Sequence, residues 1–391
     1  MKALESVLWQ HGPAREALAR QLDLSRTQAN NVVAGLLEQG WLDRGTQLAS
    51  SGGRRAEQLC LHADLGVLLC ADIGATSLSV AILGLDLSVR VQHSEAIDVR
   101  QGPAAVLSRM RAVMKLLLKA QGLKPREVLA IGIGVPGPVD FATGQLIEPP
   151  LMPGWDRYSI REDLRADYAA PVWIDNDVNL MALAELWRVK RELPNFLVIK
   201  VGTGVGCGLV CHAEVYRGAN GSAGDVGHIC VDPHGPRCHC GNVGCVEVMA
   251  GGPAIARDAT QAAQSGQSAM LAERLAQVGE LSSEDVGAAS RAGDAAAIQI
   301  VQRAGALIGQ MLAAVVNVFN PSHIFIGGGV TNIGPLFLAS LRQCVYQRSL
   351  ALSTRHLEVG YSPLGDTAGL IGAGVLALQE TLRNRGKVGT A

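Results

Sequence analysis

The segment from Gly224 to Glu247 constrains the fold more than any other part of this chain. It reads GDVGHICVDPHGPRCHCGNVGCVE, with three cysteines at C-x-C-x4-C spacing and a histidine ten residues before the first of them. Thiolates this close in sequence, on a turn that contains glycines, can converge on one point, and the imidazole can complete a tetrahedral Zn²⁺ site. The predicted ligands are His228, Cys238, Cys240 and Cys245. Because four protein ligands leave no position for water, we expect a structural zinc, and a loop of unrelated thiols is the alternative.

Length and composition indicate a multidomain α/β protein. The chain has 391 residues, which is too long for one compact domain, so two or three domains are expected. Hydrophobic residues make up 48% and charged residues 18%, which allows a substantial core and excludes a disordered chain. Only 4% of the residues are aromatic and 46 are glycine, a balance that suits tight turns between strands and helices. The formal net charge of −1 excludes a polyelectrolyte.

The cysteine usage and the N-terminal sequence predict a soluble cytoplasmic protein. The nine cysteines are an odd number, and most of those outside the segment stand alone in apolar runs, as in a reducing compartment. The stretch MKALESVLWQHGPAREALAR carries charges throughout, so it is not expected to be a signal peptide. No run reaches the roughly 18 uninterrupted apolar residues of a membrane span. We therefore expect no membrane partner.

The first sixty residues predict a helix-turn-helix. Residues 2–11 have an amphipathic helical pattern, and Pro13 is placed to open a second helix over residues 14–21. After a short LDLS connection, Ser25 is expected to cap a third helix that runs to Gln39. Two helices joined by a turn of three or four residues are typical of the helix-turn-helix plan.

The third helix is the expected DNA reader, because its first turns carry side chains that can pair with base edges or phosphates. These residues are Arg26, Thr27, Gln28, Asn30 and Asn31. The polar stretch that follows predicts a two-stranded wing, whose Arg54 and Arg55 can enter a minor groove. Residues 1–62 hold seven Lys or Arg against six Asp or Glu, so charge leaves open a three-helix cap or dimerisation unit. The order of the elements favours a winged helix-turn-helix DNA-binding domain over residues 1–62.

A repeated pattern predicts two similar lobes. Residues 66–89 read GVLLCADIGATSLSVAILGLDLSV and residues 196–218 read FLVIKVGTGVGCGLVCHAEVYRG, so in both an apolar strand, a glycine–threonine turn and another apolar strand follow each other. We interpret this as a duplicated β-hairpin. Glycine lets backbone N–H groups approach a phosphate, and threonine adds a hydroxyl donor, although simple tight hairpins are the alternative. The candidate nucleotide contacts are Gly74, Thr76, Gly202, Thr203 and Gly204.

A strand that ends in the sequence IDND is a candidate ligand site. Residues 171–185 read PVWIDNDVNLMALAE, so an apolar strand delivers Asp175, Asn176 and Asp177 to the start of a helix. A carboxylate there is stabilised by the helix dipole, which is the simpler interpretation. The functional interpretation is a ligand-binding or general-base carboxylate at a cleft between the lobes. A second buried strand, over residues 128–135, leads into a glycine–proline turn that contains Gly137.

Taken together, these motifs resemble the ROK family (repressors, open reading frames and sugar kinases) over essentially the whole chain. The resemblance implies an actin/hexokinase-like fold of two α/β lobes, one over residues 63–178 completed by a C-terminal helix over 367–391, the other over 179–366. It also implies zinc binding by the cysteine-rich segment and a sugar-activating role for Asp177. The implied sugar contacts are Gly137, Asn176, Asp177, Asp225, His228 and Glu247.

The chain departs from the kinases of that family at two places. The kinases carry Asp-x-Gly-Gly-Thr followed by a lysine-type residue at the first phosphate turn, where this chain has Ala75 and Ser77. Their Glu-x-Gly-His motif becomes Asp225-Val226-Gly227-His228, whose carboxylate is one methylene shorter. Asp177 and the GTGVG turn are kept. The resemblance therefore implies retained sugar recognition and weakened use of ATP.

These departures, with the N-terminal domain, favour the regulator branch of the family. We expect a sugar-responsive DNA-binding transcriptional regulator of carbohydrate metabolism genes, more often a repressor in this family. Its expected partners are operator DNA, a sugar or sugar-phosphate effector, and further copies of itself in a homodimer or homotetramer. The chain is expected not to be an enzyme, although the kept residues leave room for residual kinase activity. The alternative is a sugar kinase that uses ATP and Mg²⁺ with Asp177 as base, and a third possibility is a zinc-stabilised sugar-binding protein.

Overall fold

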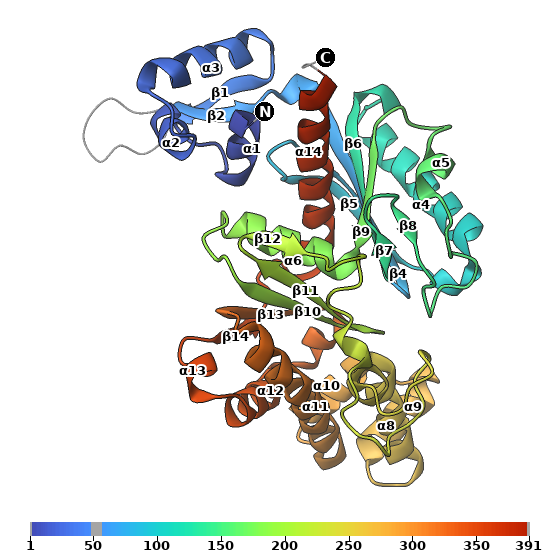
Figure 1. Ribbon diagram of the computed structural model, residues 1–391. Coiled ribbons are helices and arrows are strands. Elements are labelled where there is room, and N and C mark those ends of the chain that lie inside the picture. Colours follow the sequence, from blue (N-terminus) through green and yellow to red (C-terminus); the bar gives the residue numbers. More distant parts are fainter. Residues whose placement is uncertain (1, 48–56, 389–391) are drawn as a thin grey trace. The chain divides into compact units, whose positions relative to one another are not determined.

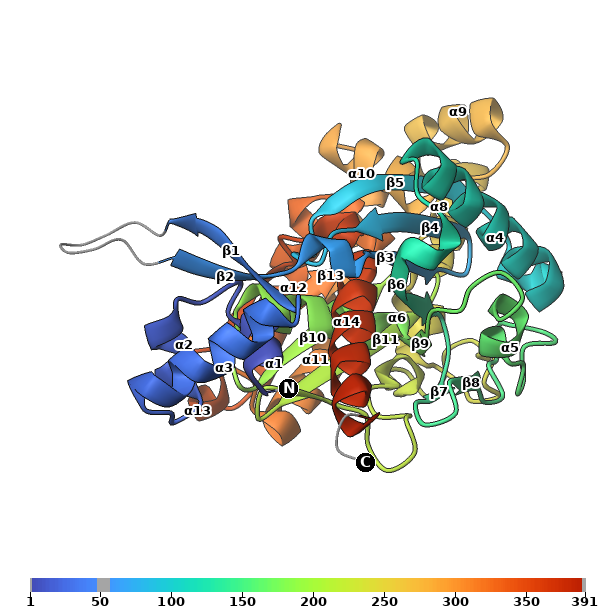
Figure 2. The same ribbon diagram turned by 90° about the horizontal axis from the view of Figure 1, so that it is seen from above.

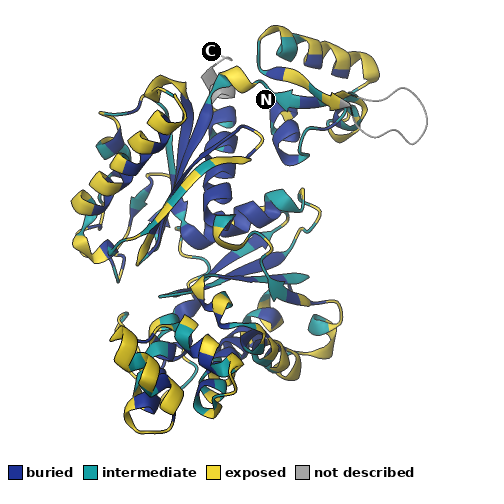
Figure 3. Ribbon diagram, turned by 180° about the vertical axis from the view of Figure 1, so that it is seen from behind, coloured by how far each residue is buried: buried dark blue, intermediate teal, exposed yellow. Residues whose placement is uncertain are grey.

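The computed structural model describes residues 2–47 and 57–388 (Figure 1). The chain forms two compact units, Met1–Glu192 together with Ala368–Ala391, and Leu193–Thr367. Each unit contains one five-stranded sheet and its own cluster of buried apolar side chains. Figure 3 shows that the strands of both sheets are mostly buried, whereas exposed residues gather on the outward faces of the helices.

Three helices and a pair of strands open the first unit. They are α1 (Lys2–Trp9), α2 (Arg15–Gln21), α3 (Arg26–Glu38), β1 (Leu42–Gln47) and β2 (Glu57–Leu61), and the two strands pair antiparallel. Ser25 caps α3 as expected, because its hydroxyl accepts from the Gln28 N–H while its own N–H donates to the Gln28 amide. The expectation for Pro13 was wrong. Helix α2 begins at Arg15, since Ala14 is extended and forms a β-bridge with Gln58.

The two five-stranded sheets have the same topology, which confirms the duplicated hairpin. The strand order is β5-β4-β3-β6-β9 in the first unit and β12-β11-β10-β13-β14 in the second. In both sheets three strands consecutive in the chain pair antiparallel, each with the next. Two further strands are added in parallel on the side of the first of these three. The strands of the first sheet are β3 (Val67–Ile73), β4 (Ser77–Leu83), β5 (Val89–Ala96), β6 (Val128–Val135) and β9 (Val172–Asn176). Those of the second are β10 (Phe196–Val201), β11 (Val205–Cys211), β12 (Glu214–Tyr216), β13 (His323–Gly327) and β14 (Glu358–Tyr361).

Helices cover the first sheet and place its ligand candidates. They are α4 (Pro103–Ala120), α5 (Ile160–Leu164), α6 (Asp177–Arg188) and α14 (Ala368–Val388), with a small strand pair of β7 (Val139–Asp140) and β8 (Gln145–Leu146). Helix α14 lies very close to its neighbours: a Cβ on Gly132 of β6 would lie 2.0 Å from the Ala373 carbonyl oxygen. The sequence-based boundary at residue 178 falls inside α6, whereas the compact unit continues to Glu192, because α6 packs against α14.

Helices also surround the second sheet. They are α7 (Val246–Ala250), α8 (Gly252–Gln264), α9 (Ala269–Val278), α10 (Ser283–Arg291), α11 (Ala295–Phe319), α12 (Pro335–Arg348) and α13 (Ala351–Thr354). Short 3₁₀ turns link elements in both units: η1 (Ala63–Leu65), η2 (Val99–Gln101), η3 (Pro125–Glu127), η4 (Val226–His228), η5 (Gly329–Ile333) and η6 (Gly365–Thr367). By length and composition α11 could cross a membrane, but ten of its residues, among them Val301, Ile308 and Leu312, are buried within the second unit. That burial is typical of a core helix.

Candidate functional site

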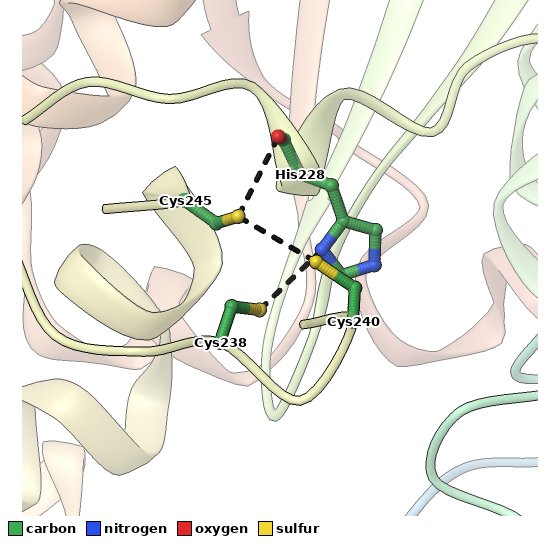
Figure 4. Close-up of side chains that lie close together, drawn as sticks. All are labelled: His228, Cys238, Cys240 and Cys245. Atoms are coloured by element: carbon green, nitrogen blue, oxygen red, sulfur yellow. Dashed lines mark hydrogen bonds between the residues drawn. The ribbon is translucent and has the colours of Figure 1, made fainter. Parts of the chain in front are cut away.

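The four predicted metal ligands converge on one point in the second unit (Figure 4). His228 ends η4, Cys238 and Cys240 lie in the loop that follows, and Cys245 is the N-cap of α7. Their ligand atoms all lie within 4.8 Å of one another. The Cys240 and Cys245 Sγ atoms are 3.7 Å apart, and the Cys238 Sγ lies 3.6 Å from the His228 Nδ1. This cluster could hold a metal ion.

Backbone geometry holds the thiol loop in a tight turn. The Cys238 N–H donates to the Asn242 carbonyl at 2.8 Å, and the Gly241 N–H donates back to the Cys238 carbonyl at 3.0 Å. Gly244 has a φ of +66°, and a Cβ there would lie 1.6 Å from the Asp232 carbonyl oxygen. Only glycine fits that position, so the glycine between the cysteines is what lets Cys245 return to the cluster.

The thiols perturb one another's pKa values. Burial raises the pKa of Cys245 to about 12, and hydrogen bonds with the thiols of Cys240 and Cys238 add to the effect. Burial also raises the pKa of Cys238. Burial opposes the shift at Cys240, but hydrogen bonds from the Asn242 backbone and from the neighbouring thiols lower its pKa. A metal ion that binds here would therefore displace protons from the Cys238 and Cys245 thiols, whose pKa values are raised.

The three sugar-contact candidates of the second unit surround Gly227. The His228 Nδ1 faces the thiols, whereas its Nε2 lies 3.8 Å from the exposed Asp225 carboxylate. A carboxylate beside the outer nitrogen of a metal-binding imidazole orients the ring. The Glu247 carboxylate accepts from the Val205 N–H at 3.0 Å and would lie 3.3 Å from a Cβ on Gly227. Asp225 and Glu247 therefore lie at the two ends of the segment that carries the cysteine–histidine cluster.

The three candidates of the first unit also lie together, at the carboxyl ends of β6 and β9. The Asn176 amide donates to the Gly137 carbonyl at 2.9 Å, and its oxygen caps α6 by accepting from the Val178 N–H at 3.0 Å. Asp177 is the first residue of α6 and is buried, with its carboxylate accepting from the Val178 N–H at 2.8 Å. This position combines a helix N-terminus with a buried carboxylate.

The sequence placed Asp175 beside these residues but did not predict its buried pairing with Asn179. Asp175 is 1% exposed and accepts from the Asn176 N–H at 2.8 Å and from the Asn179 amide at 3.1 Å. The pair holds the turn from β9 into α6. A signal was present, because a carboxylate inside an apolar strand needs a buried hydrogen-bond partner, and Asn179 lies one helical turn further on.

The glycine–threonine turns lie in different units. Gly74 and Thr76 follow β3, where the Gly74 N–H donates to the Ser77 carbonyl at 2.7 Å. Gly202, Thr203 and Gly204 follow β10, where the Gly202 N–H donates to the Gly204 carbonyl at 2.9 Å. Both turns therefore form as tight hairpins.

The predicted DNA-reading side chains of α3 all project into solvent. Arg26, Thr27, Gln28, Asn30 and Asn31 are exposed, while Ala29 and Val33 of the same helix are buried. Gln28 also closes the capping box, so its amide oxygen is already engaged. Arg54 and Arg55 lie outside the described residues.

Comparison with known proteins places this geometry in a family. The model of the ROK family matches residues 68–380. A putative xylose repressor from Caldicellulosiruptor sp. (strain Rt8B.4) is 28% identical over 380 residues, which cover 97% of this chain and 95% of that protein. A glucokinase from Halalkalibacterium halodurans is 32% identical over 311 residues, which cover 79% of this chain and 94% of that protein.

A solved structure is similar over almost the entire chain. It is the crystal structure of a ROK family transcriptional regulator described as a homologue of the E. coli MLC protein. Its TM-score is 0.80 at 28% sequence identity, and the match covers 97% of this chain and 96% of that one.

Proposed function

This chain belongs to the ROK family, and we propose that it is a sugar-responsive DNA-binding transcriptional regulator, most simply a repressor of carbohydrate metabolism genes. We place it in the cytoplasm as a homodimer or homotetramer. The observation that carries the proposal is the share of this chain that each relative matches. The repressor and the regulator of known structure match 97% of the chain, whereas the glucokinase matches 79%. The regulator matches are long enough to take in most of the N-terminal segment, which lies outside the family model.

The N-terminal segment is proposed to be a winged helix-turn-helix over residues 1–62. Helices α2 and α3 are joined by a four-residue turn, Leu22–Ser25, and the antiparallel pair β1–β2 follows. The exposed polar side chains at the start of α3 support a reading role in a major groove. Arg54 and Arg55 are proposed to contact DNA from the wing.

A structural zinc is proposed for the four-ligand cluster. A tetrahedral site with Zn–S bonds of about 2.3 Å and Zn–N bonds of about 2.0 Å has edges of roughly 3.5–3.8 Å. The thiol–thiol distance of 3.7 Å and the thiol–imidazole distance of 3.6 Å fit such edges. When bound, zinc would supply a crosslink that fixes the segment between Asp225 and Glu247.

Sugar binding is proposed for the residues implied by the family resemblance. These are Gly137, Asn176 and Asp177 of the first unit and Asp225, His228 and Glu247 of the second. The hydrogen bond between Asn176 and Gly137 and the short distance between His228 and Asp225 support the two groups. Xylose and glucose are named by the relatives and are the first sugars to test.

The rival function is an ATP-dependent sugar kinase with Asp177 as base, and the glucokinase relative supports it. Two observations favour regulation. Ser77 stands where the kinases carry a cation, and Ala75 adds a methyl group where the backbone would approach a phosphate. Asp177 would then bind a sugar hydroxyl without transferring a phosphoryl group to it.

Two assays test the proposal against its rival. In gel shifts with a duplex from the gene's own promoter, we expect salt-sensitive binding that Arg26→Ala weakens and Arg126→Ala, an exposed arginine on η3, leaves unchanged. A coupled ADP-release assay with xylose, glucose and N-acetylglucosamine should show no turnover. Turnover that Asp177→Asn abolishes, without promoter binding, would establish the kinase instead.

A further inference from the structure

Helix α1 packs against the carboxyl end of α6, where both the side chain and the backbone of Trp187 make contacts. The indole Nε1–H of Trp187 donates to the Leu8 carbonyl at 3.1 Å. The backbone carbonyl of Trp187 lies 2.9 Å from the His11 Nε2, and the two rings are tilted by 30° with their centroids 4.2 Å apart. Just beyond α6, the Arg191 guanidinium lies 3.9 Å from the centre of the Trp9 ring. The last turn of α1 and the residues after it are thus held by the last turn of α6.

The indole completes the end of α1. The last carbonyls of a helix have no partner inside it. Here the Ser6 and Val7 carbonyls accept from the Gln10 and Gly12 N–H groups, and the Leu8 carbonyl accepts from Trp187. The end of α1 therefore depends on a residue of another helix for its hydrogen bonding.

The same contact reaches the rest of the N-terminal segment. The His11 carbonyl accepts from the Gln58 side chain at 2.7 Å, and the Pro13 carbonyl accepts from the Leu59 N–H at 3.1 Å. Gln58 and Leu59 belong to β2, and α1 also contacts α2. A shift of His11 is therefore passed directly to the strand pair that follows the reading helix.

The opposite end of α6 carries the sugar-contact candidates. Asn176 is its N-cap and Asp177 its first residue, and Trp187 lies ten residues further along the same helix. At 1.5 Å per residue, this separation is roughly 15 Å. Helix α6 is unbroken, and its residues from Asp177 to Leu186 are all buried.

Close packing makes α6 move as one piece. A Cβ on Gly372 of α14 would lie 1.9 Å from the Leu180 carbonyl oxygen in the middle of α6, so the two helix backbones are in direct contact. Packed elements of this kind shift as rigid bodies and do not deform along their length. A displacement of the first turn of α6 would therefore reach Trp187.

We propose that Trp187 is a positioning residue that transmits the state of the sugar-contact end of α6 to the DNA-reading domain. The inference rests on the proposed function and adds the physical link between its two activities. Sugar alters DNA affinity because it shifts α6, and Trp187 converts that shift into a movement of Leu8 and His11. Differential contact with the two positions of α6 is the source of the coupling free energy.

The decisive variant is Trp187→Phe, which keeps an aromatic ring against His11 and removes the donor to Leu8. Its matched control is Trp173→Phe in β9, where the indole Nε1–H donates to the Thr381 hydroxyl of α14 at 3.1 Å and not to a carbonyl of α1. Both variants lose one indole hydrogen bond within the same unit. A merely structural role predicts the same consequences for both.

The measurement is the ratio of promoter affinities with and without sugar, by fluorescence anisotropy on the full chain. The probes are xylose, glucose and N-acetylglucosamine, each at saturation. Couplings between two sites are typically about 5–150-fold. We expect Trp187→Phe to reduce the ratio to below about 3-fold and to keep the sugar Kd within about 2-fold of the wild type. Trp173→Phe should keep the wild-type ratio.

The possible outcomes distinguish the role of Trp187 from the proposed regulator function. An undiminished ratio in Trp187→Phe, or an equal loss in Trp173→Phe, would overturn the role of Trp187 and leave the regulator intact. If none of the three sugars changes the promoter affinity of the wild-type protein, the proposed function itself is contradicted, and so is the role of Trp187.

Discussion

At the scale of single residues, the cysteines divide into those that share a metal cluster and those that do not. Cys238, Cys240 and Cys245 lie together with His228, whereas Cys230 is exposed and outside that group, although its backbone pairs with Cys245. Sequence alone could predict the cluster because its ligands are close in the chain and a local turn brings them together. The proposed metal ligands are therefore the site residues that follow most directly from local sequence.

Replacing a cluster cysteine should remove the stability that zinc binding provides. We expect Cys240→Ser to lose stoichiometric zinc and, at free zinc about 100-fold above Kd, to lose about 2.7 kcal/mol of metal-linked stability. For a unit of this size, that corresponds to a Tm lower by roughly 5–11 °C. Metal analysis and differential scanning fluorimetry measure both. The control Cys230→Ser should retain zinc and Tm, and equal losses in both variants would remove Cys240 from the ligand set.

Residue chemistry also predicts a pH dependence of α1 docking. Burial lowers the pKa of His11 below its usual 6.5, the hydrogen bond to the Trp187 backbone opposes the shift, and Lys190 adds to it. Because the folded pKa lies below the unfolded one, the neutral ring is favoured in the docked state. Docking is complete above pH 6.5 and weakens as the pH falls below it.

Hydrogen exchange of α1 between pH 7.5 and pH 5 measures this effect, after correction for the intrinsic exchange rate. We expect protection of α1 to fall toward pH 5 in the wild type, while protection of β3 stays constant. In His11→Gln, which cannot gain a proton, the fall should disappear. A fall of the same size in the variant would assign the effect to other groups.

At the scale of elements, the sequence predicted strands and hairpins well and helix starts less well. The apolar runs of β3, β6, β10 and β13 each lead into a turn that contains glycine, so their positions follow from pattern alone. The start of α2 could not be predicted from the pattern, because Ala14 is held extended by Gln58, a residue far along the chain. The contact between His11 and Trp187 joins residues 176 positions apart, and no local pattern encodes it.

The close approach of α14 to the first sheet gives an element-scale prediction. In Gly132→Ala, the new methyl group would lie 2.0 Å from the Ala373 carbonyl oxygen, so α14 must move away from β6. We expect a loss of roughly 1–3 kcal/mol, seen as a lower Tm. Gly35→Ala in α3 meets nothing within 4 Å and should raise stability by about 0.5–1 kcal/mol. An unchanged Tm in Gly132→Ala would mean that α14 packs less closely than described.

At the scale of the whole molecule, function depends on what the N-terminal segment adds to a family fold. The matched family model covers residues 68–380, and helices α1, α2 and α3 all precede it. Figure 2 shows α1 beside α14, and the ion pair between Glu5 and Arg383 at 3.2 Å joins the two helices. The order of elements, three helices ahead of the first five-stranded sheet, could be predicted from sequence, since helical and strand periodicities follow one another along the chain. The docking of the N-terminal segment through α6 and α14 could not, because it depends on contacts between distant residues.

Under the proposed function, one chain binds promoter DNA and a sugar, and each ligand changes the affinity for the other. The direct test is anisotropy titration of a fluorescent duplex from the gene's own promoter, with and without saturating xylose, glucose or N-acetylglucosamine. We predict at least a 5-fold change in Kd with one of the sugars. Asp177→Asn should lose that response and keep sugar-free DNA affinity, since Asp177 is buried and is not among the exposed α3 side chains proposed to contact DNA. A promoter affinity that all three sugars leave unchanged in the wild-type protein would contradict the account.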